Sequence, residues 1–346
     1  MEKIFLLATL LIVSNVSNSQ KHTYRDHINK AELAIVDSKF DSALLFYKDA
    51  FYKNKYGLGK DYFNAAQCAI KEKQFTDAKS FLLTLYQRGY ALFDSMKLKK
   101  LQTQVDTDFI SDLKKKAEKI KVNTYDYEGL RTQLEEMNEK DQYYRRKNPR
   151  DYVHKADSST IKTIDSINAY KMVAIFKKYG VPTEFMIGYA FNGKVLISNI
   201  NWEIILLHQR YDTPFRVVDF SEYLLPEIKN EKLPSHTIFR LYRTTLSNDP
   251  SPVWGHYHLY KVEDDKGSYR YAYTKQDSMT EISINKTRLA NGLETVADFR
   301  KKIIFYATAN KDFLFDFQFG EDVVSIPKYI ADKVAEQTTL IYIDKK

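Results

Sequence analysis

The chain has 346 residues, enough for about two domains of ordinary size. An apolar share of 44% and a charged share of 28%, together with 26 tyrosines and 21 phenylalanines, exclude wholesale disorder. The formal net charge is +8, and the positive residues are scattered along the chain. The single cysteine, Cys68, excludes an internal disulfide framework and any metal or iron–sulfur site built from several cysteines.

A secretory signal peptide is predicted over residues 1–19. Lys3 supplies a positive charge, and Ile4–Val13 is an apolar run of about ten residues, half the length that a membrane-spanning helix needs. Ser17 and Ser19 place small side chains at the −3 and −1 positions of a cleavage site before Gln20. An uncleaved anchor or a buried helix are the alternatives. We expect a secreted or periplasmic protein, with no transmembrane segment after the signal.

An internal repeat follows within residues 24–90. Four small or aromatic residues recur 35 positions further on, so that Ala31, Ala34, Phe40 and Ala43 match Ala66, Ala69, Phe75 and Ala78. The period resembles that of the tetratricopeptide repeat, in which small residues let two helices pack closely. We therefore predict a tetratricopeptide-like helical region over residues 20–125, with an irregular third unit after Tyr90. Cys68 lies among the alanines and is expected to be a buried packing residue.

This helical region has two possible roles. Its hairpins either bind a protein or peptide partner in a groove or serve as a packing platform for the rest of the chain. Because three units are usually needed for independent stability, we expect the two clear units to lean on the domain that follows.

A helix is predicted over residues 128–147, with an apolar stripe on one face. Asp141 falls within this stripe, and an aspartate buried alone on an apolar face would cost several kcal/mol. Arg145 is four residues further on, the spacing of an ion pair along a helix, and Gln142 flanks the aspartate. These three residues are candidate site residues.

A second helix is predicted over residues 158–179, ended by Gly180 and Pro182. Asp165 and Asn168 fall on its apolar stripe by the same angular count. Two neighbouring helices that each place polar groups inward suggest one shared polar site. This site either binds a ligand or catalyses a reaction, or it is a buried network that fixes the helix register.

Residues 126–346 are predicted to form one α-rich domain with strands near the C-terminus. An aromatic-rich β-hairpin is expected around Asp264–Gly267, and alternating phenylalanines from Phe313 to Phe319 predict a further strand, as do residues 339–343. The expected fold class is therefore α+β, mostly α: tetratricopeptide-like helical hairpins followed by a helical domain with a small antiparallel sheet.

Five short motifs occur in order between residues 128 and 305. They are Leu134–Met137 with Asp141-Gln142 and Arg145; Asp165–Asn168 with Tyr179–Thr183; Trp202–Leu207 before His208; Pro252–Tyr257; and Asn285–Arg288 with Asn291–Leu293. Together they resemble an uncharacterised bacterial family, a domain of unknown function with an Asp-Gln-x-x-Arg opening motif. The chain departs from the family at Leu207-His208-Gln209, where members usually have glutamine before the histidine, and at His256-Tyr257, where they have threonine and glutamine. The resemblance implies sites to examine, and the departures imply altered or lost chemistry if the family uses those groups.

Two function classes follow from these features. The first is a secreted or periplasmic binding protein without catalytic activity. The second is a hydrolase-like enzyme whose pocket holds Asp141, Arg145, Asn168 and His208. In the enzyme, His208 would be the general acid or base, because imidazole titrates nearest neutrality, with Asp141 as its catalytic partner. The candidate ligand-binding residues are Gln142, Arg145, Asp165, Asn168, Arg243 and His256.

Other chemistry finds weaker support. His256 and His258 share a strand face that can bind a metal, but a surface pair is the simpler interpretation, and no metal or cofactor is predicted. The aromatic and basic residues at 143–147 are also typical of nucleic-acid binding, yet the signal peptide argues against a nucleic-acid partner.

Overall fold

The structure of the chain is a computed structural model, which describes part of the residues. The residues described are 24–54, 57–90, 92–94, 103–122, 127–147, 158–191, 196–198, 202–209, 216–229, 231, 233, 259–263, 269–274, 278–290, 292–308, 312–315, 323–326 and 338–344. The predicted signal peptide lies outside them. In the part described, none of the helices is both long enough and apolar enough to cross a bilayer.

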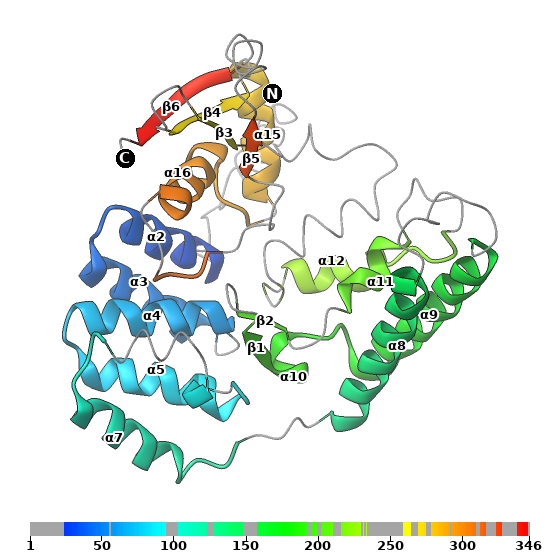
Figure 1. Ribbon diagram of the computed structural model, residues 1–346, viewed down its shortest axis with the longest axis horizontal. Coiled ribbons are helices and arrows are strands. Elements are labelled where there is room, and N and C mark those ends of the chain that lie inside the picture. Colours follow the sequence, from blue (N-terminus) through cyan, green and yellow to red (C-terminus); the bar gives the residue numbers. More distant parts are fainter. Residues whose placement is uncertain are drawn as a thin grey trace, which may run out of the picture.

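Two consecutive helical hairpins open the described chain and lie side by side (Figure 1). The first joins α2 (Tyr24–Val36) to α3 (Phe40–Lys53), and the second joins α4 (Gly59–Lys71) to α5 (Phe75–Gln87). The repeated alanines are almost completely buried, as is Cys68. The predicted helical hairpins are therefore confirmed, and we call α2–α5 the arm.

The expected third unit contains a short 3₁₀ helix, η1 (Leu92–Asp94), and the helix α7 (Thr107–Ala117). Asp106 caps α7, because its carboxylate accepts a hydrogen bond from the backbone N–H of Phe109 at 2.7 Å. Phe109 in turn packs edge-on against Phe75 of the arm, with ring centroids 5.6 Å apart.

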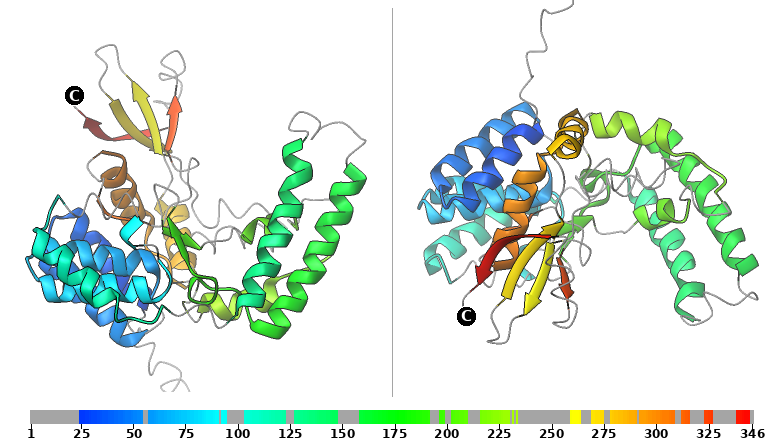
Figure 2. Two further views of the ribbon diagram at one scale, coloured as in Figure 1. Left: turned by 60° about the horizontal axis from the view of Figure 1, so that its bottom comes forward. Right: turned by 90° about the horizontal axis from the view of Figure 1, so that it is seen from above.

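A second group of helices lies on the other side of the molecule (Figure 2). Its long helices are α8 (Glu128–Lys147) and α9 (Ser158–Tyr179), whose bounds agree with the prediction. Gly180 ends α9 with φ +81°, and its N–H bonds to the carbonyl of Phe176 at 2.9 Å. The shorter elements that follow are α10 (Glu184–Ile187), β1 (Tyr189–Phe191), β2 (Leu196–Ser198), α11 (Glu203–Leu207) and α12 (Ser221–Lys229).

The C-terminal part returns to the arm. It consists of β3 (Leu259–Glu263), β4 (Tyr269–Thr274), α15 (Ser278–Ala290), α16 (Val296–Thr308), β5 (Val323–Ile326) and β6 (Thr338–Asp344). Helix α16 lies against α2 (Figure 1). The core of the arm includes side chains from this distant part of the chain, Phe313 and Phe315 among them.

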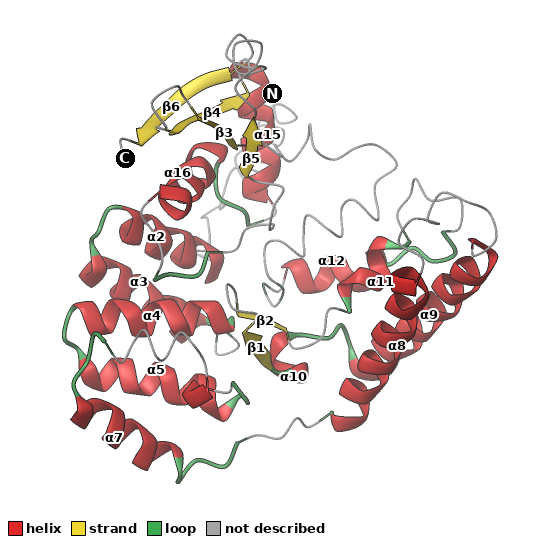
Figure 3. Ribbon diagram, viewed as in Figure 1, coloured by secondary structure: helices red, strands yellow, loops and turns green. Residues whose placement is uncertain are grey.

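The predicted fold class is wrong in its small antiparallel sheet. Consecutive helical hairpins dominate the described residues (Figure 3), and the four described C-terminal strands form a mixed sheet in the order β5-β3-β4-β6. β5 pairs parallel to β3, while β3–β4 and β4–β6 are antiparallel. A parallel pair needs a crossover connection, here through α15 and α16, and periodicity along a strand does not reveal the direction of its neighbour.

The strand predicted from the alternating phenylalanines is also wrong where the structure describes it. Residues 312–315 have no regular secondary structure. Phe313, Leu314 and Phe315 are all at most 4% exposed, so burial does not alternate along this segment. The segment is covered on both sides because Phe313 packs on Phe40 of the arm and Phe315 packs on Phe305 of α16, and its apolar residues therefore do not mark one face of a strand.

Candidate functional site

The candidate site lies where α8, α9 and the end of α11 meet. Leu134 and Met137 of α8 share one core with Met172 of α9 and Trp202, which precedes α11. This apolar packing fixes the helices and determines which polar side chains meet. On both long helices the buried face continues into polar residues, as the periodicity predicted.

Arg145 joins the two helices at this point. Its Nη1 lies 2.8 Å from Asp141 Oδ1 on its own helix, and its Nη2 lies 2.5 Å from Asp165 Oδ1 on α9. Nη1 also donates to the backbone carbonyl of Asp141 at 3.0 Å. All three side chains are at most 7% exposed, so one guanidinium neutralises two buried carboxylates.

His208, the residue that follows α11, completes the cluster. Its Nδ1 lies 3.0 Å from Asp141 Oδ1 and 3.5 Å from Asp165 Oδ1. Its side chain is 19% exposed, against 0% for Asp141. The imidazole therefore lies between a buried pair of carboxylates and the surface. We call Asp141, Arg145, Asp165 and His208 the polar cluster.

The two carboxylates of the cluster differ in their pKa. For Asp141, burial raises the pKa, but the hydrogen bond and charge of His208 and the charge of Arg145 outweigh it, so the net pKa is lowered. For Asp165, burial dominates over Arg145, and the net pKa is raised. Asp141 is thus the carboxylate held ionised beside the imidazole.

Two glutamines support the cluster. Gln142 Nε2 donates to Asp141 Oδ2 at 2.6 Å, as its place in the motif suggested. Gln209 was not among the predicted residues, although it is 1% exposed and bonds the backbone of two segments. Its Nε2 is 3.4 Å from the carbonyl of Asp165, and its Oε1 accepts from the N–H of Val217 at 2.8 Å. The sequence signals were its position next to His208 and the departure from the family motif there.

The remaining predicted residues are not seen in the cluster. Asn168 is 3% exposed on α9, one turn after Asp165, and its Nδ2 has no hydrogen-bond partner among the described residues. Arg243 and His256 lie outside the residues that the structure describes, as does His258. The structure therefore brings together Asp141, Gln142, Arg145, Asp165 and His208.

One potential group of metal ligands occurs among the described residues, formed by Asp141, Asp165 and His208, with ligand atoms within 4.8 Å of one another. Arg145 already bonds the Oδ1 atoms of both carboxylates that face the imidazole. A divalent cation there would lie next to a guanidinium and would have to displace it. The donor set therefore fits an ion-paired histidine better than a metal centre.

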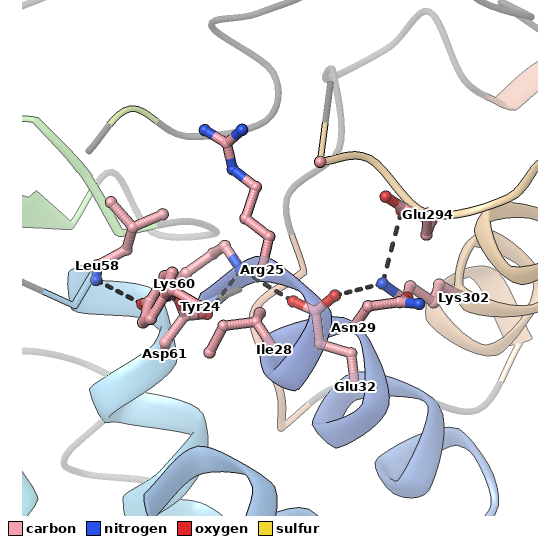
Figure 4. Close-up of a pocket in the computed structure, with 11 residues that line it drawn as sticks. Tyr24, Arg25, Ile28, Asn29, Glu32, Leu58, Lys60, Asp61, Glu294 and Lys302 are labelled. Carbon is pink, nitrogen blue, oxygen red and sulfur yellow. Dashed lines mark hydrogen bonds and ion pairs between the residues drawn. The ribbon is translucent and has the colours of Figure 1, made fainter. Parts of the chain in front are cut away.

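A second polar centre lies between the arm and the C-terminal part (Figure 4). Glu32 of α2 binds two lysines, with Lys60 Nζ at 2.8 Å from Oε1 and Lys302 Nζ at 2.6 Å from Oε2. Lys60 also pairs with Asp61 at 2.7 Å, and Asp61 accepts from the hydroxyl of Tyr24 at 2.5 Å. The sequence gives no local signal of this network, because its members are up to 270 residues apart.

The network at the second centre encloses little space. The cavity beside it holds about 40 Å³, room for one or two waters. Burial raises the pKa of Glu32, but the charges of Lys302 and Lys60 outweigh it, so the net pKa of Glu32 is lowered. Burial lowers the pKa of Lys302, but the charges of Glu294 and Glu32 outweigh it, so the net pKa of Lys302 is raised. Both directions favour the charged pair. The paired charges and the small cavity indicate a junction between α2 and α16 rather than a ligand site.

No family model, curated protein or solved structure matches the chain. The resemblance to an uncharacterised bacterial family is therefore a proposal that rests on the motifs alone. The four residues of the polar cluster come from the first three of the five motifs. Gln142 and Gln209, which support the cluster, lie next to Asp141 and His208 in the sequence.

Proposed function

We propose that the protein is a hydrolase-like enzyme that acts outside the cytoplasm, with His208 as general acid and base. The observation that carries this proposal is the contact of His208 Nδ1 with Asp141 Oδ1 at 3.0 Å, at a partly exposed imidazole. A carboxylate on one ring nitrogen orients the imidazole and stabilises its protonated form. The other nitrogen, Nε2, would exchange the proton with substrate or water.

Arg145 has a positioning role in this mechanism. It holds Asp141 and Asp165 at once, and this keeps both carboxylates at fixed distances from the imidazole. Its own charge is already shared between two acids, so binding of an anionic substrate is not required of it. Water is the simplest nucleophile for such a site, and hydrolysis is therefore the reaction class that we favour.

A purely structural network is the competing explanation, because buried ion pairs also fix helix register. The two explanations differ at His208. A structural network needs the imidazole only as a hydrogen-bond partner of Asp141, and glutamine can supply such a donor. Catalysis needs a group that takes up and releases a proton near neutral pH, and glutamine has none.

The test compares the full chain with His208→Gln on chromogenic esters, phosphoesters, glycosides and peptides. We expect hydrolysis of one class by the parent protein and a loss of about 100-fold or more in the variant. Glu139→Gln is the matched control, since it is an exposed acid on the same helix as Asp141 and should leave the rate unchanged. A parent protein inactive on all four classes, or a fully active His208→Gln protein, would contradict the proposal.

A binding protein is the second candidate, with the arm as a repeat of the tetratricopeptide kind. The observation that favours it is that side chains of α4 already hold a segment from the far end of the chain. Secretion or export to a periplasm belongs to both proposals and rests on residues 1–19. Enrichment of envelope proteins on the immobilised full chain tests the binding role, and no enrichment over an unrelated protein of similar charge would count against it.

A further inference from the structure

Residues 312–315, Asp-Phe-Leu-Phe, lie against α4 although about 250 residues separate them in sequence. We call them the docked segment. Its backbone is bonded by side chains of the arm. Asn64 Nδ2 donates to the carbonyl of Leu314 at 2.7 Å, and the N–H of Leu314 donates to Asn64 Oδ1 at 2.7 Å. A single amide thus satisfies both backbone groups of one residue.

A second amide one turn along α4 extends this contact. Gln67 Nε2 lies 3.4 Å from the carbonyl of Asp312. Gln67 is 1% exposed, and its Oε1 has no hydrogen-bond partner among the described residues. A buried acceptor without a donor is costly, and a bound segment can supply the missing N–H. The α4 face therefore carries hydrogen-bonding capacity beyond what the docked segment uses.

Side chains of the arm also contact the side chains of the docked segment. Phe313 stacks on Phe40, with ring centroids 5.7 Å apart and an angle of 16° between the planes. Lys71 Nζ lies 5.1 Å from the Phe40 ring and 5.9 Å from the Phe313 ring, and 3.8 Å from Asp312 Oδ2. An acidic residue followed by an aromatic one fits this corner of the arm, because the cation attracts both.

We propose that this face of the arm, together with Phe305 of α16, whose ring lies 5.8 Å from that of Phe315, is a recognition site for peptides of the form Asp-aromatic-Leu-aromatic, and that the docked segment is its intramolecular occupant. Backbone hydrogen bonds with separate side-chain pockets are how proteins bind a segment of another chain. The partner is a protein carrying such a segment. The inference rests on the binding role given as the second candidate and is independent of His208.

An intramolecular occupant is a strong competitor. A tethered segment acts at an effective concentration in the millimolar range, so a free peptide binds the parent protein poorly. Weakening the docked segment without harming the core should open the site. Asp312 suits this purpose because its side chain is 28% exposed and contacts the arm through Lys71. Asp312→Lys places two positive charges opposite each other.

The experiment measures fluorescence anisotropy of a labelled peptide with the sequence of residues 310–317. We expect at least tenfold tighter binding to the Asp312→Lys protein than to the parent protein, and no binding of a scrambled peptide. Adding Lys71→Asp restores the internal ion pair with reversed charges, so the double variant should again bind the peptide poorly. His208→Gln introduced into the Asp312→Lys protein should leave its affinity for the peptide unchanged.

A second variant guards against a docked segment that stays closed in the Asp312→Lys protein. Phe313→Ala removes the stack on Phe40, and its folding is checked by circular dichroism and urea unfolding. The inference would be overturned if the peptide bound neither of the two folded variants, or if the scrambled peptide bound equally well. A further outcome separates the two proposals. If the immobilised chain enriches an envelope protein that lacks the motif, and the peptide does not bind, this inference is overturned but the broader binding role stands.

Discussion

Arg145 is the residue on which the polar cluster depends. Removing its guanidinium would leave two buried carboxylates facing each other across His208, each without its cation. A more exposed ion pair on the same helix provides the contrast: Arg131 Nε lies 2.9 Å from Glu135 Oε1, and the two side chains are 26% and 51% exposed. Burial, rather than the distance between the charges, separates the two cases.

At this scale we expect Arg145→Met to lower the free energy of unfolding by about 3–5 kcal/mol, because it breaks two buried ion pairs. Arg131→Met, the same substitution on the same helix, should cost less than about 1 kcal/mol. Urea denaturation at pH 7 measures both. An equal loss of unfolding free energy in the two variants would show that Arg145 contributes no more to stability than the cation of a surface ion pair.

The residues of the site that could be predicted are those on the long helices. Asp141 and Asp165 were predicted because each interrupts an apolar stripe of clear period. Gln209 could not be, since it follows a five-residue helix too short to show a period. Glu32 and Lys60 could not be paired either, because nothing local to α2 or α4 signals their meeting.

Two glycines that end helices show what determines the boundary of an element. Gly180 and Gly292 both have positive φ, +81° and +68°, and both lie in the loop that follows a helix. A side chain added at Gly180 would meet nothing within 4 Å, whereas at Gly292 it would lie 3.3 Å from two atoms of Arg25. The sequence predicted the first of these ends, from Gly180 and Pro182, but the approach of Arg25 depends on tertiary packing.

We expect Gly180→Ala to cost about 1–2 kcal/mol, the strain of a left-handed backbone alone. Gly292→Ala should cost more, because the Arg25 side chain, held by its hydrogen bond to the carbonyl of Leu233, must also shift slightly to admit the methyl group. Thermal unfolding of both variants beside the parent protein checks this order. The reverse order would mean that Arg25 relocates freely.

The arm and the C-terminal part form one unit at the scale of the whole molecule. Helix α16 contacts α2, and Lys302 reaches Glu32 at 2.6 Å between them. The docked segment and the strands β5 and β6 follow α16 in the chain, whereas β3 and β4 precede α15. The parallel pairing of β5 with β3 and the docking of residues 312–315 were not predicted, since the pairing of distant segments depends on which faces remain uncovered after local folding. The helical hairpins themselves were predictable because their period is local.

Lys302→Met should lower the free energy of unfolding by about 3–5 kcal/mol at pH 7, since Glu32 loses one of its two cations. The raised pKa of Lys302 adds stability that is fully present below the ordinary value of 10.5 and is lost as the pH rises through the raised value. The gap between parent and variant should therefore close only in strong alkali. Lys301→Met, 62% exposed at its side chain, is the control. A gap that closes near pH 8 would contradict the assignment.

The most direct measurement of the central claim is the structure of crystals soaked in a mixture of metabolites. We expect bound density within hydrogen-bond distance of His208 Nε2 in the parent protein, with no such density in the His208→Gln protein. Density only at other places, or a closed surface over His208 in the soaked crystals, would show that Asp141, Arg145 and Asp165 serve packing alone.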